Sequence, residues 1–221
     1  MNVHEALKNR KSTRAFLAKP VEHEKIMAIL QAARHSPSGT NAQPWQVAVV
    51  SGRKKDELCQ AMVDTFRNQG EGTMDYHYYP LEWHEPFKKR RVTCGAQLYS
   101  ALKIERHDKE RRLQQWIANY RAFDAPVVLF FFLHPAMQKG SFLDFGMFLQ
   151  SIMLAAVEEG LATCAQASLG QYPKLVKDFL GYDQDTVLLC GMALGYEDTE
   201  APVNRYRTER EEVEVFTRFF K

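Results

Sequence analysis

An apolar run with no polar interruption constrains the fold of this chain more than any other feature. Residues 126–133 read Pro-Val-Val-Leu-Phe-Phe-Phe-Leu, and a short run of this kind favours a buried strand. Side chains of a strand point alternately to the two faces of its sheet. Because none of these side chains is polar, both faces must be covered. We therefore predict that this strand lies at the centre of the sheet.

Apolar residues recur at helical spacing in other segments and form shorter runs elsewhere. Helices are predicted over residues 2–9, 20–33, 53–69, 87–104, 109–120, 141–159 and 173–180. Strands are predicted over residues 45–50, 161–167 and 186–196. The periodicity lapses over residues 70–86, where Tyr76, Tyr78, Tyr79 and Trp83 predict an aromatic-rich loop. This loop either roofs a pocket for a flat ligand or packs on itself.

Two further apolar segments must be covered. The helix over residues 141–159 is apolar on most sides, so it lies in the core or in a subunit interface. The tail, residues 201–221, carries Val213, Val215, Phe216, Phe219 and Phe220 near its end. In a monomer this tail would wrap around the body, and in a dimer it would embrace the partner.

Charge and cysteine usage exclude several classes of protein. A formal charge of +2 supplies no broad field for nucleic acid or an anionic membrane. The four cysteines are far apart in sequence and show no metal-ligand spacing, which is typical of reduced thiols. The first residues lack the apolar segment of a signal peptide. We expect one domain over residues 1–221, located in the cytoplasm, that binds neither nucleic acid nor a membrane.

The segment after the first helix is a candidate phosphate site. Arg10, Ser12 and Arg14 alternate, so in an extended chain all three project from one face. The planar fork of arginine matches phosphate oxygens, and a hydroxyl adds a short neutral hydrogen bond. The alternative is a solvated basic strand edge.

A polar loop over residues 35–45 is a candidate site for a planar heterocycle. Ser38, Thr40, Asn41 and Gln43 offer donors and acceptors on short side chains, and Gly39 allows another group to approach closely. Two prolines, one of them Pro37, restrict the backbone. The alternative is a turn that caps the preceding helix.

Other chemistries find little support in the sequence. No metal-binding motif and no glycine-rich nucleotide loop occurs. Residues 166–170, with Ser168 at the centre, loosely resemble the nucleophile elbow of a hydrolase. However, Gln166 stands where glycine is required, and no histidine follows Ser168. The alternative is a hydrolase with Ser168 as its nucleophile.

In combination, these segments resemble the FMN-dependent nitroreductase family, and the chain is most similar to its nitrobenzoate-reductase-like branch. The resemblance spans nearly the whole chain in order. It rests on Arg10-x-Ser12-x-Arg14-x-Phe16, residues 36–45, Asp144-x-Gly146, Gly160-Leu161-x-Thr163-Cys164, residues 191–196 and residues 202–210.

The resemblance implies an α+β fold, with a mainly antiparallel sheet among helices, in an intertwined homodimer with FMN at the interface. Arg10, Ser12, Arg14 and Arg207 would hold the phosphate and ribityl chain, with Arg205 nearby. Pro37, Ser38, Gly39 and Asn41 would reach the flavin from the partner subunit. The backbone at Ala167 and Ser168 would approach flavin N5, although residues 166–168 depart from the Pro-x-Glu-Gly of better-known relatives.

The implied activity is reduction of nitroaromatic compounds, including nitrobenzoates, to hydroxylamines, with NADH or NADPH as donor. FMN would accept hydride at N5, and Arg14 is the candidate for stabilising the negative charge left near N1. Donor and acceptor would use the same flavin face in turn, with Tyr76 to Trp83 shaping the acceptor pocket. The alternatives are a related flavoenzyme acting on quinones, on halogenated aromatics or on the flavin itself, and a non-catalytic flavin-binding protein.

Overall fold

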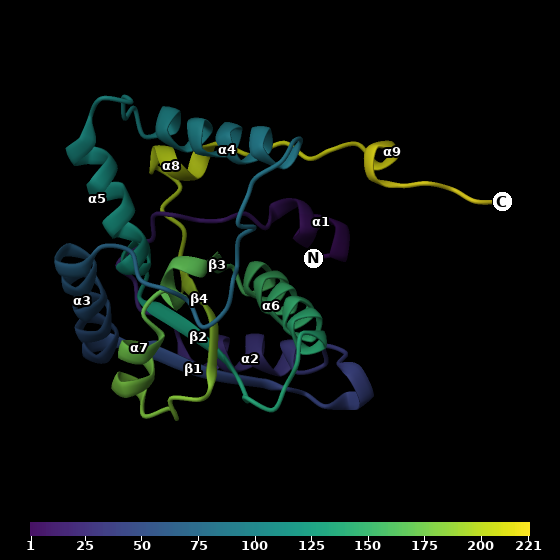
Figure 1. Cartoon of the computed structure of the whole chain (residues 1–221). Coiled ribbons are helices and arrows are strands. Elements are labelled where there is room, and N and C mark those ends of the chain that lie inside the picture. The colour runs from purple at the N-terminus through teal and green to yellow at the C-terminus, as the bar shows by residue number, and fades with distance from the viewer.

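The computed structural model describes all 221 residues, and Figure 1 shows the arrangement of its elements. The strands are β1 (Trp45–Ser51), β2 (Val127–Leu133), β3 (Ala162–Gln166) and β4 (Val187–Gly195). The α-helices are α1 (Val3–Asn9), α2 (His23–Ala33), α3 (Gly52–Gln69), α4 (Phe87–Ala101), α5 (Lys109–Tyr120), α6 (Gly140–Glu158), α7 (Pro173–Leu180), α8 (Pro202–Arg205) and α9 (Val213–Phe216). Short 3₁₀ helices are η1 (Gly39–Asn41), η2 (Ala122–Asp124) and η3 (Ala167–Gly170).

The four strands form one antiparallel sheet in the order β1-β2-β4-β3. All seven residues of β2 are buried, so the central strand predicted from the apolar run is confirmed. The register of β2 on β4 shifts between Phe131, which pairs with Cys190, and Phe132, which pairs with Leu188. Leu189 is therefore the extra residue of a bulge in β4.

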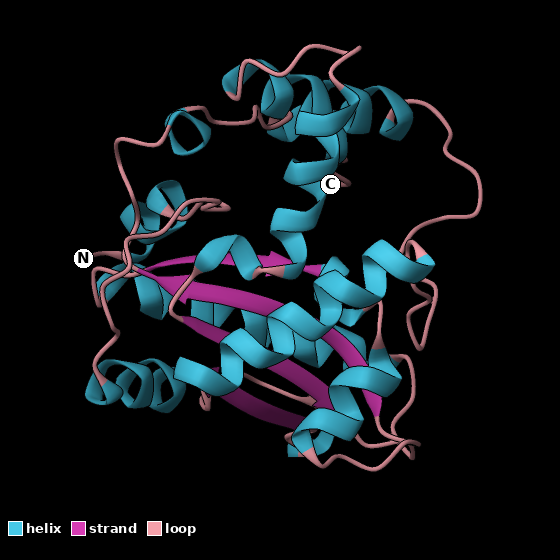
Figure 2. Cartoon of the chain, turned by 90° about the vertical axis from the view of Figure 1, so that its left-hand side faces the viewer, coloured by secondary structure: helices cyan, strands magenta, loops and turns pink.

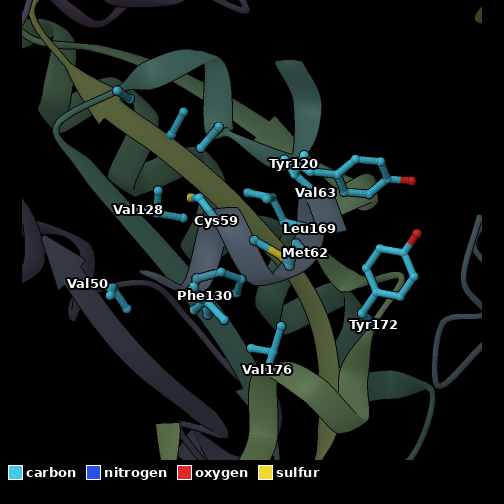
Figure 3. Packing of buried hydrophobic residues seen from close by; sticks show 14 of the residues in the cluster. Val50, Cys59, Met62, Val63, Tyr120, Val128, Phe130, Leu169, Tyr172 and Val176 are labelled. Carbon is cyan, nitrogen blue, oxygen red and sulfur yellow. The ribbon is translucent and has the colours of Figure 1, made fainter. Parts of the chain in front are cut away.

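Helices cover both faces of the sheet, as Figure 2 shows. On one face Val128, Phe130 and Phe132 pack with residues of α3, α5 and α7. Figure 3 shows part of this cluster, with the hydroxyls of Tyr120 and Tyr172 at its edge. On the other face the alternate residues of β2 pack with α2 and α6. This division follows from the two-residue period of a strand, and it gives the predicted α+β class.

Several element boundaries differ from the sequence prediction, although α5 and α7 match it. Helix α2 begins at His23 instead of residue 20, because Glu22 is still extended and serves as the N-cap residue. Helix α4 ends at Ala101 instead of residue 104, since Lys103 adopts a positive φ of 51°. Strand β3 ends at Gln166, and Ala167 already belongs to η3.

The loop over residues 70–86 contains no helix or strand, as predicted. Its first residues lie against the body. Tyr172 donates its hydroxyl to the carbonyl of Gly70 over 2.5 Å, and Tyr76 donates to the carbonyl of Leu189 over 2.9 Å. Its later part faces solvent, and Leu81 is 91% exposed.

From residue 213 on, the C-terminal tail does not wrap around its own chain. It runs outward from the body (Figure 1), and Val213, Val215, Phe216, Phe219 and Phe220 are all exposed. The end of the tail is therefore not covered by its own chain, whereas Val203 and Asn204 at its start are buried. Helix α6 also retains exposed apolar residues, including Leu143. By length and composition alone α6 could cross a membrane, but Phe145, Phe148 and Ile152 place one side of it on the sheet.

Candidate functional site

The segment after α1 is held in extended form beside β3. Ser12 forms an isolated parallel bridge with Thr163, and the N–H of Thr13 donates to the carbonyl of Thr163 over 2.9 Å. Thr13 is completely buried, whereas its neighbours Ser12 and Arg14 are only partly buried. Arg10, Ser12 and Arg14 line one and the same pocket, which Lys11 lines as well.

This pocket has a volume of about 420 Å³ and is enclosed by α1, the segment after it, α4 and the chain that follows α8. Its lining is dominated by basic and hydroxyl-bearing side chains. These are His4, Lys8, Arg10, Lys11, Ser12, Arg14, Tyr206, Arg207, Thr208 and Arg210, with Leu7, Cys94 and Val203 as the remaining residues. No aspartate or glutamate lines it.

The positive charges of the pocket are not neutralised within the chain. Among the lysines and arginines that line it, only Lys11 has a carboxylate partner, Glu197 at 2.6 Å. Burial, together with the charges of Arg210 and Arg207, lowers the pKa of Arg10. Since the nearby cations repel one another, the site favours an anion that offers oxygens to several donors. The arrangement suits a phosphate group.

Arg207 reaches the pocket from the C-terminal segment, whereas Arg205 does not. The Arg207 guanidinium donates to the carbonyl of Arg10 over 3.0 Å and to that of Lys8. Arg205 faces the other way, where it pairs with Glu200 at 2.9 Å. The structure therefore brings together four of the five predicted phosphate residues and places Arg205 outside the pocket.

Asn204 is a residue of the site that sequence reasoning did not single out. It is only 2% exposed, and its side-chain carbonyl accepts from the N–H of Arg14 over 2.8 Å. Its side-chain amide donates to the carbonyls of Ala15 and Asp198 over 2.9 and 2.8 Å. Asn204 thus joins the segment that carries Arg14 to the segment that carries Arg207. No local signal predicts this, because Arg14 lies 190 positions away in the chain.

Ala167 and Ser168 lie in η3, which follows the end of β3 that is distant from the basic pocket. Both are partly buried, and neither lines the pocket. At about 3.3 Å per residue, the three steps along β3 from Thr163, which bridges Ser12, to Gln166 rise by roughly 10 Å, and Ala167 follows.

The predicted heterocycle loop lies apart from the basic pocket. Its N–H at Gly39 donates to Asp144 of α6 over 3.1 Å, and the Ser38 hydroxyl accepts from the N–H of Gln43 over 2.9 Å. Pro37, Gly39 and Asn41 are exposed, and a Cβ placed on Gly39 would meet no atom within 4 Å. Within one chain the pocket residues, the pair Ala167 and Ser168, and this loop therefore lie in three separate places.

The similarity of this chain to known proteins extends over nearly its whole length. The sequence profile of the Nitroreductase family matches residues 7–196. The chain is 35% identical to a nitrobenzene nitroreductase of Ectopseudomonas oleovorans, covering 98% of this chain and 96% of that protein. It is 36% identical to a 4-nitrobenzoate reductase of Pseudomonas putida, covering 96% of this chain and 92% of that protein. The crystal structure of the FMN and NADPH-dependent nitroreductase NfnB from Sphigopyxis sp. strain HMH superposes with a TM-score of 0.97, at 37% identity and with full coverage of both chains.

Proposed function

This chain belongs to the nitroreductase family, and we propose that it is an FMN-dependent enzyme that uses NADPH to reduce nitroaromatic compounds to hydroxylamines. Similar proteins are named for nitrobenzene and 4-nitrobenzoate, and one solved relative is named for both FMN and NADPH. Each nitro group takes up two hydrides and two protons and releases one water, so two NADPH are converted to two NADP⁺. We propose nitrobenzoates as one class of acceptor.

The observation that carries this proposal is the basic pocket without a carboxylate in its lining. Arg10, Ser12, Arg14 and Arg207 converge there, and these donors fit the phosphate of FMN. When bound, FMN supplies hydride acceptance and donation at N5. The roughly 10 Å rise along β3 from Thr163 to Gln166 suggests that Ala167 and Ser168 adjoin the ring system when the phosphate lies beside Ser12. Arg14 remains our candidate for the positive charge near N1.

We further propose a homodimer in which the partner completes each flavin site. Pro37, Ser38, Gly39 and Asn41 lie outside the basic pocket of their own chain, which supports their use by the other subunit. The exposed apolar tail and the uncovered side of α6 support an extensive interface. Since all four cysteines are free, a cytoplasmic location is also proposed. We treat residues 1–221 as one domain, because helices cover both faces of a single sheet.

An anaerobic visible spectrum tests the proposed function directly. The purified protein, supplied with FMN, is expected to show a flavin spectrum that bleaches with NADPH and returns when 4-nitrobenzoate is added. A spectrum that NADPH leaves unchanged would indicate a flavin-binding protein without this activity. If quinones or halogenated aromatics restore the colour and nitroaromatics do not, the acceptor class is wrong. A protein that stays colourless with FMN would refute the cofactor site.

Steady-state kinetics are expected to follow a ping-pong pattern. Because donor and acceptor are proposed to use the same flavin face in turn, each must leave before the other binds. Double-reciprocal plots against NADPH at several concentrations of 4-nitrobenzoate should give parallel lines. Lines that intersect would show both molecules bound together and would rule out the shared face.

Replacing Asn204 by alanine should weaken binding of FMN about tenfold and of riboflavin much less. The substitution removes the three hydrogen bonds that join the segments carrying Arg14 and Arg207, and each unmet buried partner costs about 1–3 kcal/mol. Flavin fluorescence titrations measure both affinities. Asn204→Asp keeps the acceptor for Arg14 and should be intermediate. Equal losses for FMN and riboflavin would show a general defect unrelated to the phosphate.

A further inference from the structure

An ion pair between a buried lysine and a partly buried aspartate fastens the aromatic-rich loop to the body of the protein. The Lys177 side chain on α7 is 3% exposed, and its ammonium lies 3.0 and 3.3 Å from the two carboxylate oxygens of Asp75. The same ammonium donates to the carbonyls of Gln184 and Thr186, each at 2.9 Å. All of its donor capacity is therefore used, which is what a buried lysine requires.

The other contacts of the loop meet the sheet at the bulge of β4. A carboxylate oxygen of Asp75 accepts from the N–H of Leu188 over 2.9 Å, and the hydroxyl of Tyr76 donates to the carbonyl of Leu189 over 2.9 Å. Leu189 is the extra residue of the bulge. The backbone of β4 at the bulge thus forms hydrogen bonds with two adjacent side chains of the loop, those of Asp75 and Tyr76. Burial raises the pKa of Tyr76, so this hydroxyl remains a donor.

The fastened part of the loop also lies along η3. A Cβ on Gly170, the last residue of η3, would come within 2.9 Å of the side chain of Met74 and 3.4 Å of the carbonyl of Leu189. Gly72 packs so closely on Gln171 and Tyr172 that a Cβ there would lie 2.1 Å from the Gln171 carbonyl. Residues 70–76, the bulge and η3 consequently form one tightly packed unit.

Aromatic side chains continue outward from this unit. The ring of Tyr76 meets Phe142 edge-on with a centroid distance of 5.0 Å and lies 6.3 Å from Tyr78. Tyr78 then meets Tyr79 at 4.7 Å, and Tyr79 meets Trp83 at 5.8 Å. The position of this chain of rings depends on where its first member, Tyr76, is held.

We propose that Asp75 and Lys177 are positioning residues that hold the aromatic rings of residues 76–83 in place relative to Ala167 and Ser168, and thereby determine how tightly an aromatic nitro acceptor binds. This inference rests on the proposed function, which places the flavin ring beside η3. Neither residue lines the basic pocket, so neither contributes to holding the phosphate. Their effect is specific to acceptors that must stack beneath the aromatic rings.

The double variant Asp75→Asn with Lys177→Met tests this proposal without leaving an uncompensated buried charge. Lys174→Met is the matched control, because Lys174 lies on the same helix and pairs with Asp178 in an exposed setting, with side chains 81% and 54% exposed. Tyr76→Phe is a milder second variant that removes only the hydrogen bond to the bulge. Circular dichroism and FMN titration establish that each variant is folded and loaded.

The readout is reoxidation of the dithionite-reduced holoenzyme in a stopped-flow instrument. For the double variant we expect the apparent Kd of 4-nitrobenzoate to rise about tenfold, and for Tyr76→Phe about threefold. Reoxidation by ferricyanide, which needs no stacking site, should keep its wild-type rate in every variant. Lys174→Met should match the wild type with both acceptors.

Two outcomes would overturn the inference. If the variants slow ferricyanide and 4-nitrobenzoate equally, the ion pair supports the flavin or the fold in general. If 4-nitrobenzoate reoxidises the variants with its wild-type Kd, the pair does not position the rings. Failure of the unmodified protein to bind FMN or to react with nitroaromatics would instead refute the proposed function, and the wild-type control detects this separately.

Discussion

Replacing both Arg10 and Arg207 by alanine is expected to yield a protein that purifies without FMN. The two guanidiniums come from opposite ends of the chain and line one pocket that contains no carboxylate. A charge-assisted hydrogen bond contributes about 1.5–3 kcal/mol, which corresponds to roughly a 10- to 150-fold loss of affinity for each arginine. The double variant should therefore bind FMN at least two orders of magnitude more weakly than the wild type.

Isothermal titration with FMN measures this loss, and riboflavin shows whether it concerns the phosphate. Riboflavin lacks the phosphate, so its affinity should change little. Arg205→Ala is the control for loss of charge, because this substitution removes one arginine that pairs with Glu200 outside the pocket. Full FMN retention by the double variant would refute the phosphate site. An equal loss in Arg205→Ala would show that only the overall charge matters.

Deleting residues 213–221 is expected to convert the protein into a monomer that binds FMN poorly. The deleted residues include Phe216, Phe219 and Phe220, which are 70%, 78% and 90% exposed in the single chain. Burying one such side chain stabilises an interface by about 1.5–3 kcal/mol, and a symmetric dimer buries each of them twice. Because we propose that the partner completes the flavin site, dimerisation and FMN affinity should decrease together.

Sedimentation velocity and FMN titration at matched protein concentrations measure the two effects. Leu113→Ser serves as the control, since Leu113 is an exposed apolar residue on the charged helix α5, 43% exposed. It should remain dimeric and fully loaded. A truncated protein that is still dimeric would show that the tail lies outside the interface. A monomer that keeps wild-type FMN affinity would show that each site is complete within one chain.

Local patterns predicted the part of the site that depends only on neighbouring residues. The alternation of extended backbone predicts that Arg10, Ser12 and Arg14 share a face, and all three line the basic pocket. The same reasoning could not separate Arg205 from Arg207. Both are arginines of one short segment, and only the orientation of α8 directs the first to Glu200 and the second into the pocket.

Contacts between segments that are distant in the sequence could not be predicted from local patterns. Asn204 satisfies the backbone of Arg14, and Lys177 pairs with Asp75 across 102 positions. Lys177 stands in no recognisable motif, and the motif over residues 202–210 does not indicate that Asn204 contacts Arg14. An asparagine or lysine would ordinarily be assigned to the surface. Their burial depends on which segments the fold places side by side, and this is not encoded in any short window.

The sequence alone determined the layered architecture, since seven consecutive apolar residues in β2 require cover on both faces of the sheet. It also determined which residues can bind a phosphate, through their chemistry and their spacing. The tertiary structure decided which of these residues lie close together in space. It set the bulge at Leu189, turned Asn204 inward and left residues 213–221 at the end of the tail uncovered. The physical reason is that periodicity is set by bonds along the chain, whereas register, burial and pairing are set by contacts between segments that only folding brings together.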